Sequence, residues 1–200
     1  VAQRKRVHSL DVLDAMAATV RHRGPDASGV WADPAAGVGL AHRRLAIMDL
    51  SPAGAQPMWS ASRRYCIVFN GEIYNFAALA DELRSLGMQF RGHSDTEVIL
   101  AAVDNWGLER TLGRLSGMFA FALWDSRERR LHLVRDRIGE KPLYSGICGG
   151  TLLFGSELKS LRAHPAWSAE IDRQSLSLLM RYGYIPDPYS IYQGIYKLPP

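Results

Sequence analysis

The 200-residue chain is predicted to fold as an α+β domain, in which antiparallel sheet packs against helices. Two apolar runs, 117–124 and 131–134, flank a short polar turn, which is the spacing of an antiparallel hairpin. Strand-like and helical runs occur in groups, and no strand–helix–strand repeat is visible, which argues against a doubly wound parallel sheet. With 47% hydrophobic and 22% charged residues, the composition is that of a globular chain with a substantial core.

The first helix is expected to begin after Ser9, because serine is a favoured N-cap and apolar residues follow at helical spacing. It should end by Gly24-Pro25, since proline cannot continue a helix. A third signal is Ser94 with Glu97, which have the capping-box spacing. The complete set of expected helices is 9–20 (followed by a charged loop, 21–26), 75–86, 94–106, 156–161 (capped by Ser156) and 173–181.

Strands are expected where short apolar or alternating runs lie between turn residues. These runs are 29–32, 38–42, 45–50, 64–69, 117–124, 131–134 and 152–154, with another strand after the turn that begins at 135. The tail 182–200 is rich in proline and tyrosine and is expected to be extended.

Composition and spacing also exclude several function classes. The net charge is +4, but no basic stripe interleaved with aromatics occurs, so nucleic acid is not an expected partner. No apolar run approaches the roughly 20 residues of a membrane span. Cys66 and Cys148 form no Cys-x-x-Cys pair, and the histidines lack ligand spacing. We therefore expect no disulfide framework, no metal site and a cytoplasmic protein.

The stretch 70–75, Asn-Gly-Glu-Ile-Tyr-Asn, follows the apolar run 66–69 and allows two interpretations. Asn-Gly between apolar runs is a strong hairpin signal. Alternatively, the Asn70 amide and the Gly71 N–H donate to one point, as an oxyanion hole requires. Asp95 likewise is either a simple first-turn acid or a carboxylate that the helix dipole keeps ionised for binding.

Seven motifs in order carry a resemblance that spans nearly the whole chain. They are RHRGPD (21–26), LAHRRLAIMD (40–49), NGEIYN (70–75), SDTE (94–97), GMFAFALWD (117–125), RDRxGxKPLY (135–144) and SELKSL (156–161). The chain resembles the glutamine amidotransferase domain of glutamine-hydrolysing asparagine synthetases.

The resemblance implies an N-terminal-nucleophile hydrolase fold, a four-layer sandwich of two antiparallel sheets between helical layers. Residues 1–181 would be the glutaminase domain, and 182–200 the start of a connector to an ATP-dependent synthetase domain. L-Glutamine is the implied substrate, and the product ammonia would serve asparagine synthesis. The glutaminase domain needs no cofactor, whereas ATP and Mg belong to the synthetase domain. A homodimeric parent fits the resemblance, but the sequence shows no interface.

The resemblance also assigns site residues. Asn70 and Gly71 correspond to the oxyanion hole, and Arg44 to the group that binds the substrate α-carboxylate, a task that suits a guanidinium fork. Glu72 and Asp95 correspond to the acceptors of the α-ammonium group. The remaining assigned positions are Ile47 and Met48 beside the glutamine, and Arg23 and Met118 near the exit for ammonia.

One departure bears on activity. Members of this family begin Met-Cys-Gly, and that cysteine is the nucleophile, whereas the printed chain starts at Val1. The printed polypeptide is therefore expected to lack glutaminase activity. The alternatives are a non-catalytic module that senses glutamine, and the amidotransferase domain of a related enzyme with another acceptor.

Overall fold

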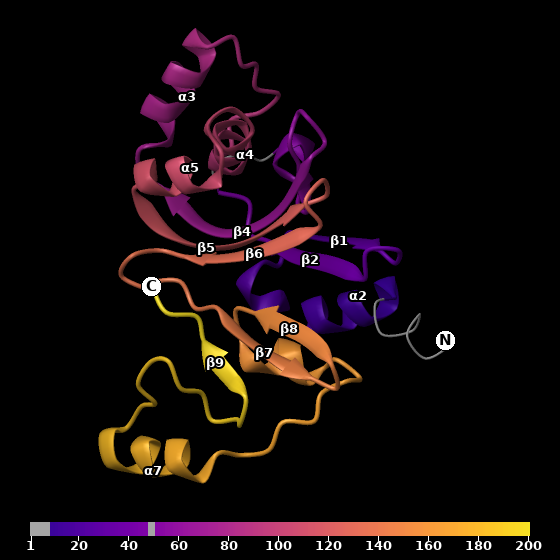
Figure 1. The fold of residues 1–200 in the computed structure, drawn as a ribbon, viewed down its shortest axis with the longest axis vertical. Coiled ribbons are helices and arrows are strands. Elements are labelled where there is room, and N and C mark those ends of the chain that lie inside the picture. The colour runs from indigo at the N-terminus through magenta and orange to yellow at the C-terminus, as the bar shows by residue number, and fades with distance from the viewer. Residues whose placement is uncertain (1–8, 48–50) are drawn as a thin grey trace.

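The computed structural model describes residues 9–47 and 51–200, which form a mixed α+β structure with antiparallel strand pairs (Figure 1). The largest sheet has the order β3-β4-β5-β6. Its long central strands are β4 (Tyr65–Ile73) and β5 (Gly117–Asp125), with β3 (Met58–Trp59) and β6 (Arg130–Arg135) outside them. Antiparallel pairing of β5 with β6 confirms the predicted hairpin.

Two smaller sheets complete the strands of the described residues. In one, β1 (Ala27–Asp33) pairs with β2 (Val38–Arg44). In the other, the order is β8-β7-β9, made of β7 (Tyr144–Cys148), β8 (Thr151–Gly155) and β9 (Ile195–Lys197). Both β2 and β8 are therefore edge strands of their sheets.

The two faces of β4 are both buried, which explains its continuous apolar run. Ile67 and Phe69 belong to a core shared with α3 (Phe76–Ser85) and α4 (Asp95–Trp106), which lie above the sheet in Figure 1 with α5 (Leu108–Arg114). The alternate residues Cys66 and Val68 pack instead with Val38 and Leu40 of β2. Because successive side chains of a strand point to opposite faces, Asn70 belongs to the face that looks toward β2.

The remaining helices lie on the far side of β2 and at the end of the chain. Helix α2 (Leu10–Ala18) packs on β2 and on α6 (Leu158–Arg162). Helix α7 (Arg173–Tyr182) lies apart from these, at the bottom of Figure 1. No helix among the described residues is long and apolar enough to cross a bilayer.

Several predicted helix starts are confirmed by their caps. The Ser9 hydroxyl accepts the Val12 N–H at 3.4 Å, and the Ser94 hydroxyl accepts the Glu97 N–H at 3.2 Å. The Glu97 carboxylate, however, accepts the N–H groups of Arg91 and Gly92, at 2.8 and 2.9 Å. Glu97 therefore anchors the preceding loop, where a closed capping box was expected.

Other local predictions are wrong. Residues 45–47, the described part of the expected strand 45–50, are not a strand. The N-cap of α6 is Glu157 without a side-chain cap, where Ser156 was expected. Strand β4 runs on through Asn70 to Ile73, because β5 pairs with it as far as Gly117, so the hairpin interpretation of Asn70-Gly71 is wrong. Three elements escaped prediction: β3, α5, and β9 within the extended tail.

Candidate active site

Asn70 lies within β4, opposite Ala120 of β5, and is among the residues that line a cavity. The amide nitrogen Nδ2 is buried and has no hydrogen-bond partner among the described residues. A buried donor without a partner costs about 1–3 kcal/mol of desolvation. The fold therefore holds a hydrogen-bond donor ready at this position.

Gly71 is required by the close approach of β5. A Cβ atom built at this position would lie 2.2 Å from the Met118 carbonyl oxygen and 2.6 Å from the Phe119 Cα. These are backbone atoms of the neighbouring strand, so they cannot move aside as a flexible side chain would. Glycine therefore follows Asn70 because the backbone of β5 leaves no room for a side chain at position 71.

Asp95 and Glu72 form the acidic part of the site. Asp95 is the first residue of α4, is only 7% exposed, and its Oδ2 accepts the Ile73 N–H at 3.1 Å. Burial raises the pKa of Asp95 and the charge of Glu72 raises it further, while hydrogen bonds from Ile73 and Thr96 oppose the shift. Burial is thus the largest influence on this carboxyl, and the effect expected of the helix dipole stays a prediction.

Arg44 is the last residue of β2, and its Nη1 donates to the Ser51 carbonyl oxygen at 2.9 Å. Ile47, predicted to lie beside the substrate, is 74% exposed. Met48 lies outside the described residues. The structure therefore places Arg44 beside Ser51, and the substrate-binding roles of these three residues stay predictions.

Arg23 and Met118, predicted to lie near an ammonia exit, are in different places. Arg23 lines the cavity, and its Nη1 lies 3.2 Å from Glu157 Oε1. Glu157 also binds His22 and Lys159, both at 2.9 Å. Although burial raises the pKa of Glu157, these partners outweigh it and bring the pKa to about 2. Met118 lies on β5 opposite Glu72 and is not among the residues that line the cavity.

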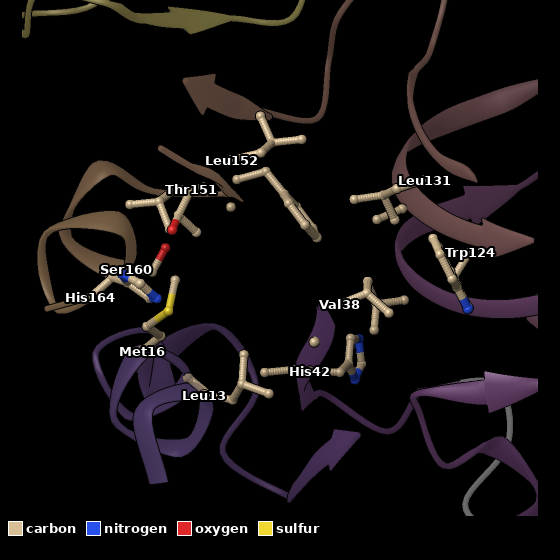
Figure 2. Close-up of a pocket in the computed structure, with 18 of the residues that line it drawn as sticks. Leu13, Met16, Val38, His42, Trp124, Leu131, Thr151, Leu152, Ser160 and His164 are labelled. Carbon is tan, nitrogen blue, oxygen red and sulfur yellow. The ribbon is translucent and has the colours of Figure 1, made fainter. Parts of the chain in front are cut away.

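The cavity has a volume of about 1210 Å³ and lies between β2 and β8, with α2 and α6 beside it (Figure 2). His42 and Val38 of β2 are on one wall in Figure 2, and Thr151 and Leu152 of β8 are on another. Asn70 borders this space, whereas Arg44, Glu72 and Asp95 do not line it. The cavity therefore brings together Asn70 and Arg23 among the predicted residues, and it does not include the acidic pair.

Neither cysteine of the chain suits the role of a nucleophile. Cys66 is fully buried in the core between β4 and β2, and burial raises the pKa of its thiol to about 12. Cys148 is also buried, at 3% exposure. Nucleophilic attack needs an accessible thiolate, which confirms the inert role that their surroundings in the sequence indicated.

Sequence reasoning missed two residues that touch the backbone beside Asn70. His42 Nε2 donates to the Phe69 carbonyl oxygen at 3.0 Å, so Nε2 carries the proton. Burial lowers the pKa of His42 to about 4, and Arg44 and Arg43 contribute to the lowering. Gln56 Oε1 accepts the Phe69 N–H at 2.6 Å. Both are 13 or more residues from Phe69 in the chain, and no spacing rule links them to it.

Comparisons with known proteins place the chain in a family. The family described as "Glutamine amidotransferase domain" matches residues 1–200. Asparagine synthetase [glutamine-hydrolyzing] 3 of Bacillus subtilis is 39% identical over 99% of this chain and 32% of its own length. Amidase chry2 of Gibberella zeae is 37% identical over 90% of this chain and 26% of its own. The chain therefore spans about a third or less of these relatives.

A solved structure supports the fold. Glutamine phosphoribosylpyrophosphate amidotransferase from B. subtilis, complexed with ADP and GMP, superposes with a TM-score of 0.67 at 19% identity. The match covers 78% of this chain and 41% of that one. It agrees with the mixed α+β architecture described above.

Proposed function

The chain belongs to the glutamine amidotransferase domain family, and on that premise we propose that it binds L-glutamine and directs its amide nitrogen to ATP-dependent asparagine synthesis. The observation that carries the proposal is the buried, unpartnered Nδ2 of Asn70, two residues before Glu72 on the same strand. The Asp95 carboxylate accepts a hydrogen bond from the N–H of Ile73, the last residue of that strand. One ligand with an amide at one end and an ammonium at the other matches this order of groups.

Each substrate group has a chemically suited partner in this proposal. The carboxylates of Glu72 and Asp95 bind the α-ammonium, and the Arg44 guanidinium binds the α-carboxylate as a fork. When a thiolate attacks the side-chain amide carbon, a C–S bond forms and the carbonyl oxygen becomes an oxyanion. Asn70 Nδ2 and the Gly71 N–H stabilise that oxyanion. Its collapse breaks the C–N bond and releases ammonia, and water then hydrolyses the thioester to glutamate.

We propose that the nucleophile is carried by an extended segment that lies between β2 and β8. Among the described residues, β2 pairs only with β1, and β8 only with β7, so each has one unpaired edge. Both strands contribute consecutive residues to the walls of the cavity. Unpaired strand edges accept an added strand readily. Such a strand would join the two smaller sheets into one and complete a four-layer sandwich with the sheet of β4 and β5.

The printed chain contains no cysteine other than Cys66 and Cys148, both of which are buried. It should therefore bind glutamine without hydrolysing it. In the complete gene product, residues 1–181 would act as the glutaminase domain, and 182–200 would lead to a cytoplasmic synthetase domain that uses ATP and Mg. The relatives, three or more times longer than this chain, support that arrangement.

Isothermal titration of L-glutamine into the printed chain tests binding, with L-glutamate as the comparison ligand. Asn70→Ala should weaken glutamine binding, whereas Asn105→Ala, at an exposed asparagine of α4, should not. In the complete gene product, Asn70→Ala should lower kcat for glutamine hydrolysis about 100-fold, the usual effect of deleting an oxyanion donor. If neither polypeptide binds glutamine, the proposal fails.

The similarity to a fungal protein named amidase supports a second candidate, in which ammonia or the amide serves an acceptor other than aspartate. Assay of the complete gene product with ATP, glutamine and aspartate separates the two. Formation of asparagine supports the first candidate. Glutamine hydrolysis without asparagine formation supports the second. The coding sequence on both sides of this segment gives an independent check, because a Met-Ala or Met-Ser start would favour a glutamine sensor.

A further inference from the structure

The backbone N–H and carbonyl of Phe69 are both hydrogen-bonded to side chains of other segments. Gln56 Oε1 accepts its N–H at 2.6 Å, and His42 Nε2 donates to its carbonyl oxygen at 3.0 Å. That carbonyl belongs to the peptide bond that leads into Asn70. Fixing this peptide fixes the direction in which the Asn70 side chain leaves the strand.

Gln56 also reaches the acidic part of the site. Its Nε2 donates to the Thr96 hydroxyl oxygen at 3.3 Å. Thr96 follows Asp95 directly at the start of α4, and its N–H and hydroxyl act to lower the pKa of the Asp95 carboxyl. One side chain therefore joins Phe69, the residue before Asn70, to Thr96, the residue after Asp95, through two hydrogen bonds.

The main chain of Gln56 is itself held in place by β1. A Cβ atom built on Gly29 would lie 2.0 Å from the Gln56 carbonyl oxygen, so β1 packs directly on this backbone. His42 stands on β2, which is paired with β1 over its whole length. Gln56 and His42, which bond to the Phe69 backbone, therefore belong to segments that pack on or pair with the same strand, β1.

We propose that His42 and Gln56 are positioning residues of the glutamine site, which set the Asn70 amide and the Asp95 carboxylate at their working separation. The inference rests on the proposed function, because it assigns those two groups to the two ends of one substrate. Errors of about 1 Å in such a constellation can cost about 100-fold in rate. Any donor and any acceptor could satisfy the hydrogen bonds of a buried peptide group. The side chains present here also connect the surroundings of two groups of the site, which a purely structural role does not require.

Variants at His42 and at Thr96 should have different kinetic effects in the complete gene product. His42→Leu removes the donor to Phe69, so kcat for glutamine hydrolysis should fall about tenfold or more, with KM within about twofold. His42→Gln places an amide N–H near the same carbonyl and should restore kcat to within about threefold of the parent. Thr96→Val removes the hydrogen bond to Gln56 and should raise KM about tenfold, with kcat little changed. Thr111→Val, at a buried threonine of α5, is the matched control.

A second measurement tests the arrangement without activity. In the printed chain, amide hydrogen exchange at Phe69 should speed up at least tenfold in Gln56→Leu and stay within threefold in Thr96→Val. Equal kinetic losses in His42→Leu and His42→Gln, or parallel changes of kcat and KM in every variant, would overturn the positioning role. If the parent neither binds nor hydrolyses glutamine, the proposed function fails. The exchange data then decide only whether the hydrogen bond to Gln56 protects the Phe69 amide. Exchange as slow in Gln56→Leu as in the parent would refute that protection.

Discussion

His42 should make the fold sensitive to acid, and His42→Gln should remove that sensitivity. The ordinary pKa of histidine, 6.5, is lowered to about 4 in the fold, mainly by burial and also by Arg44 and Arg43. A base whose pKa is lowered on folding stabilises the protein above the unfolded pKa and loses this contribution as pH falls toward the folded one. The interval of about 2.5 pH units corresponds to about 3 kcal/mol, at about 1.4 kcal/mol for each.

Urea unfolding between pH 7.5 and 4.5 measures this effect. Over that range the parent should lose about 2–3 kcal/mol more of its unfolding free energy than His42→Gln does. The comparison isolates His42, because every other titrating group is common to both proteins. His132→Gln, at a half-buried histidine of β6, is the control and should retain the acid loss. Parallel stability curves for the parent and His42→Gln would refute the assignment of a buried, neutral imidazole.

Four further outcomes are expected. Asp95→Asn should raise stability at pH 7, measured by urea unfolding, because a carboxyl whose pKa is raised on folding is destabilising once ionised. The same change should weaken glutamine binding at least about tenfold by titration calorimetry, since the charge opposite the ammonium is lost. Gly71→Ala should cost about 3 kcal/mol or more, because its Cβ meets the Met118 carbonyl oxygen at 2.2 Å. In a thiol titration at pH 8, native protein should react slowly at Cys66 and Cys148, and unfolding should expose two thiols.

The sequence was sufficient where a feature depends on neighbouring residues. The caps at Ser9 and Ser94 and the hairpin of β5 and β6 are local, and each was predicted. The extent of β4 was not, because its last four residues are held in the strand by β5, more than forty residues away. Strand β9 likewise exists only through its pairing with β7, and no local pattern marks it within a proline-rich tail.

The residues of the candidate site also fall into two groups, those that the sequence indicated and those that depend on distant contacts. Asn70 and Asp95 were assigned because they lie in two of the motifs that carry the resemblance, NGEIYN (70–75) and SDTE (94–97). The roles of His42 and Gln56 are invisible in the chain, since each depends on a peptide 27 or 13 residues away. The raised pKa of Asp95 also depends on tertiary structure, because its largest cause is burial, which local sequence does not show.

Two unfavourable features of the site have a common explanation. The structure buries the Asn70 Nδ2 donor without a partner, and it buries the Asp95 carboxylate near the charge of Glu72. Each lowers stability, and a fold selected for stability alone could remove both by apolar substitution. A ligand that brings an acceptor to Asn70 and a cation to the two carboxylates relieves both at once. Gln56 bonds to Phe69 and Thr96, the chain neighbours of Asn70 and Asp95, so under the positioning role proposed above the relief would depend on the distance between the two ends of the ligand. An amino acid with a longer or shorter side-chain amide would satisfy one group and leave the other unpaired, which explains why such a site would select glutamine over asparagine.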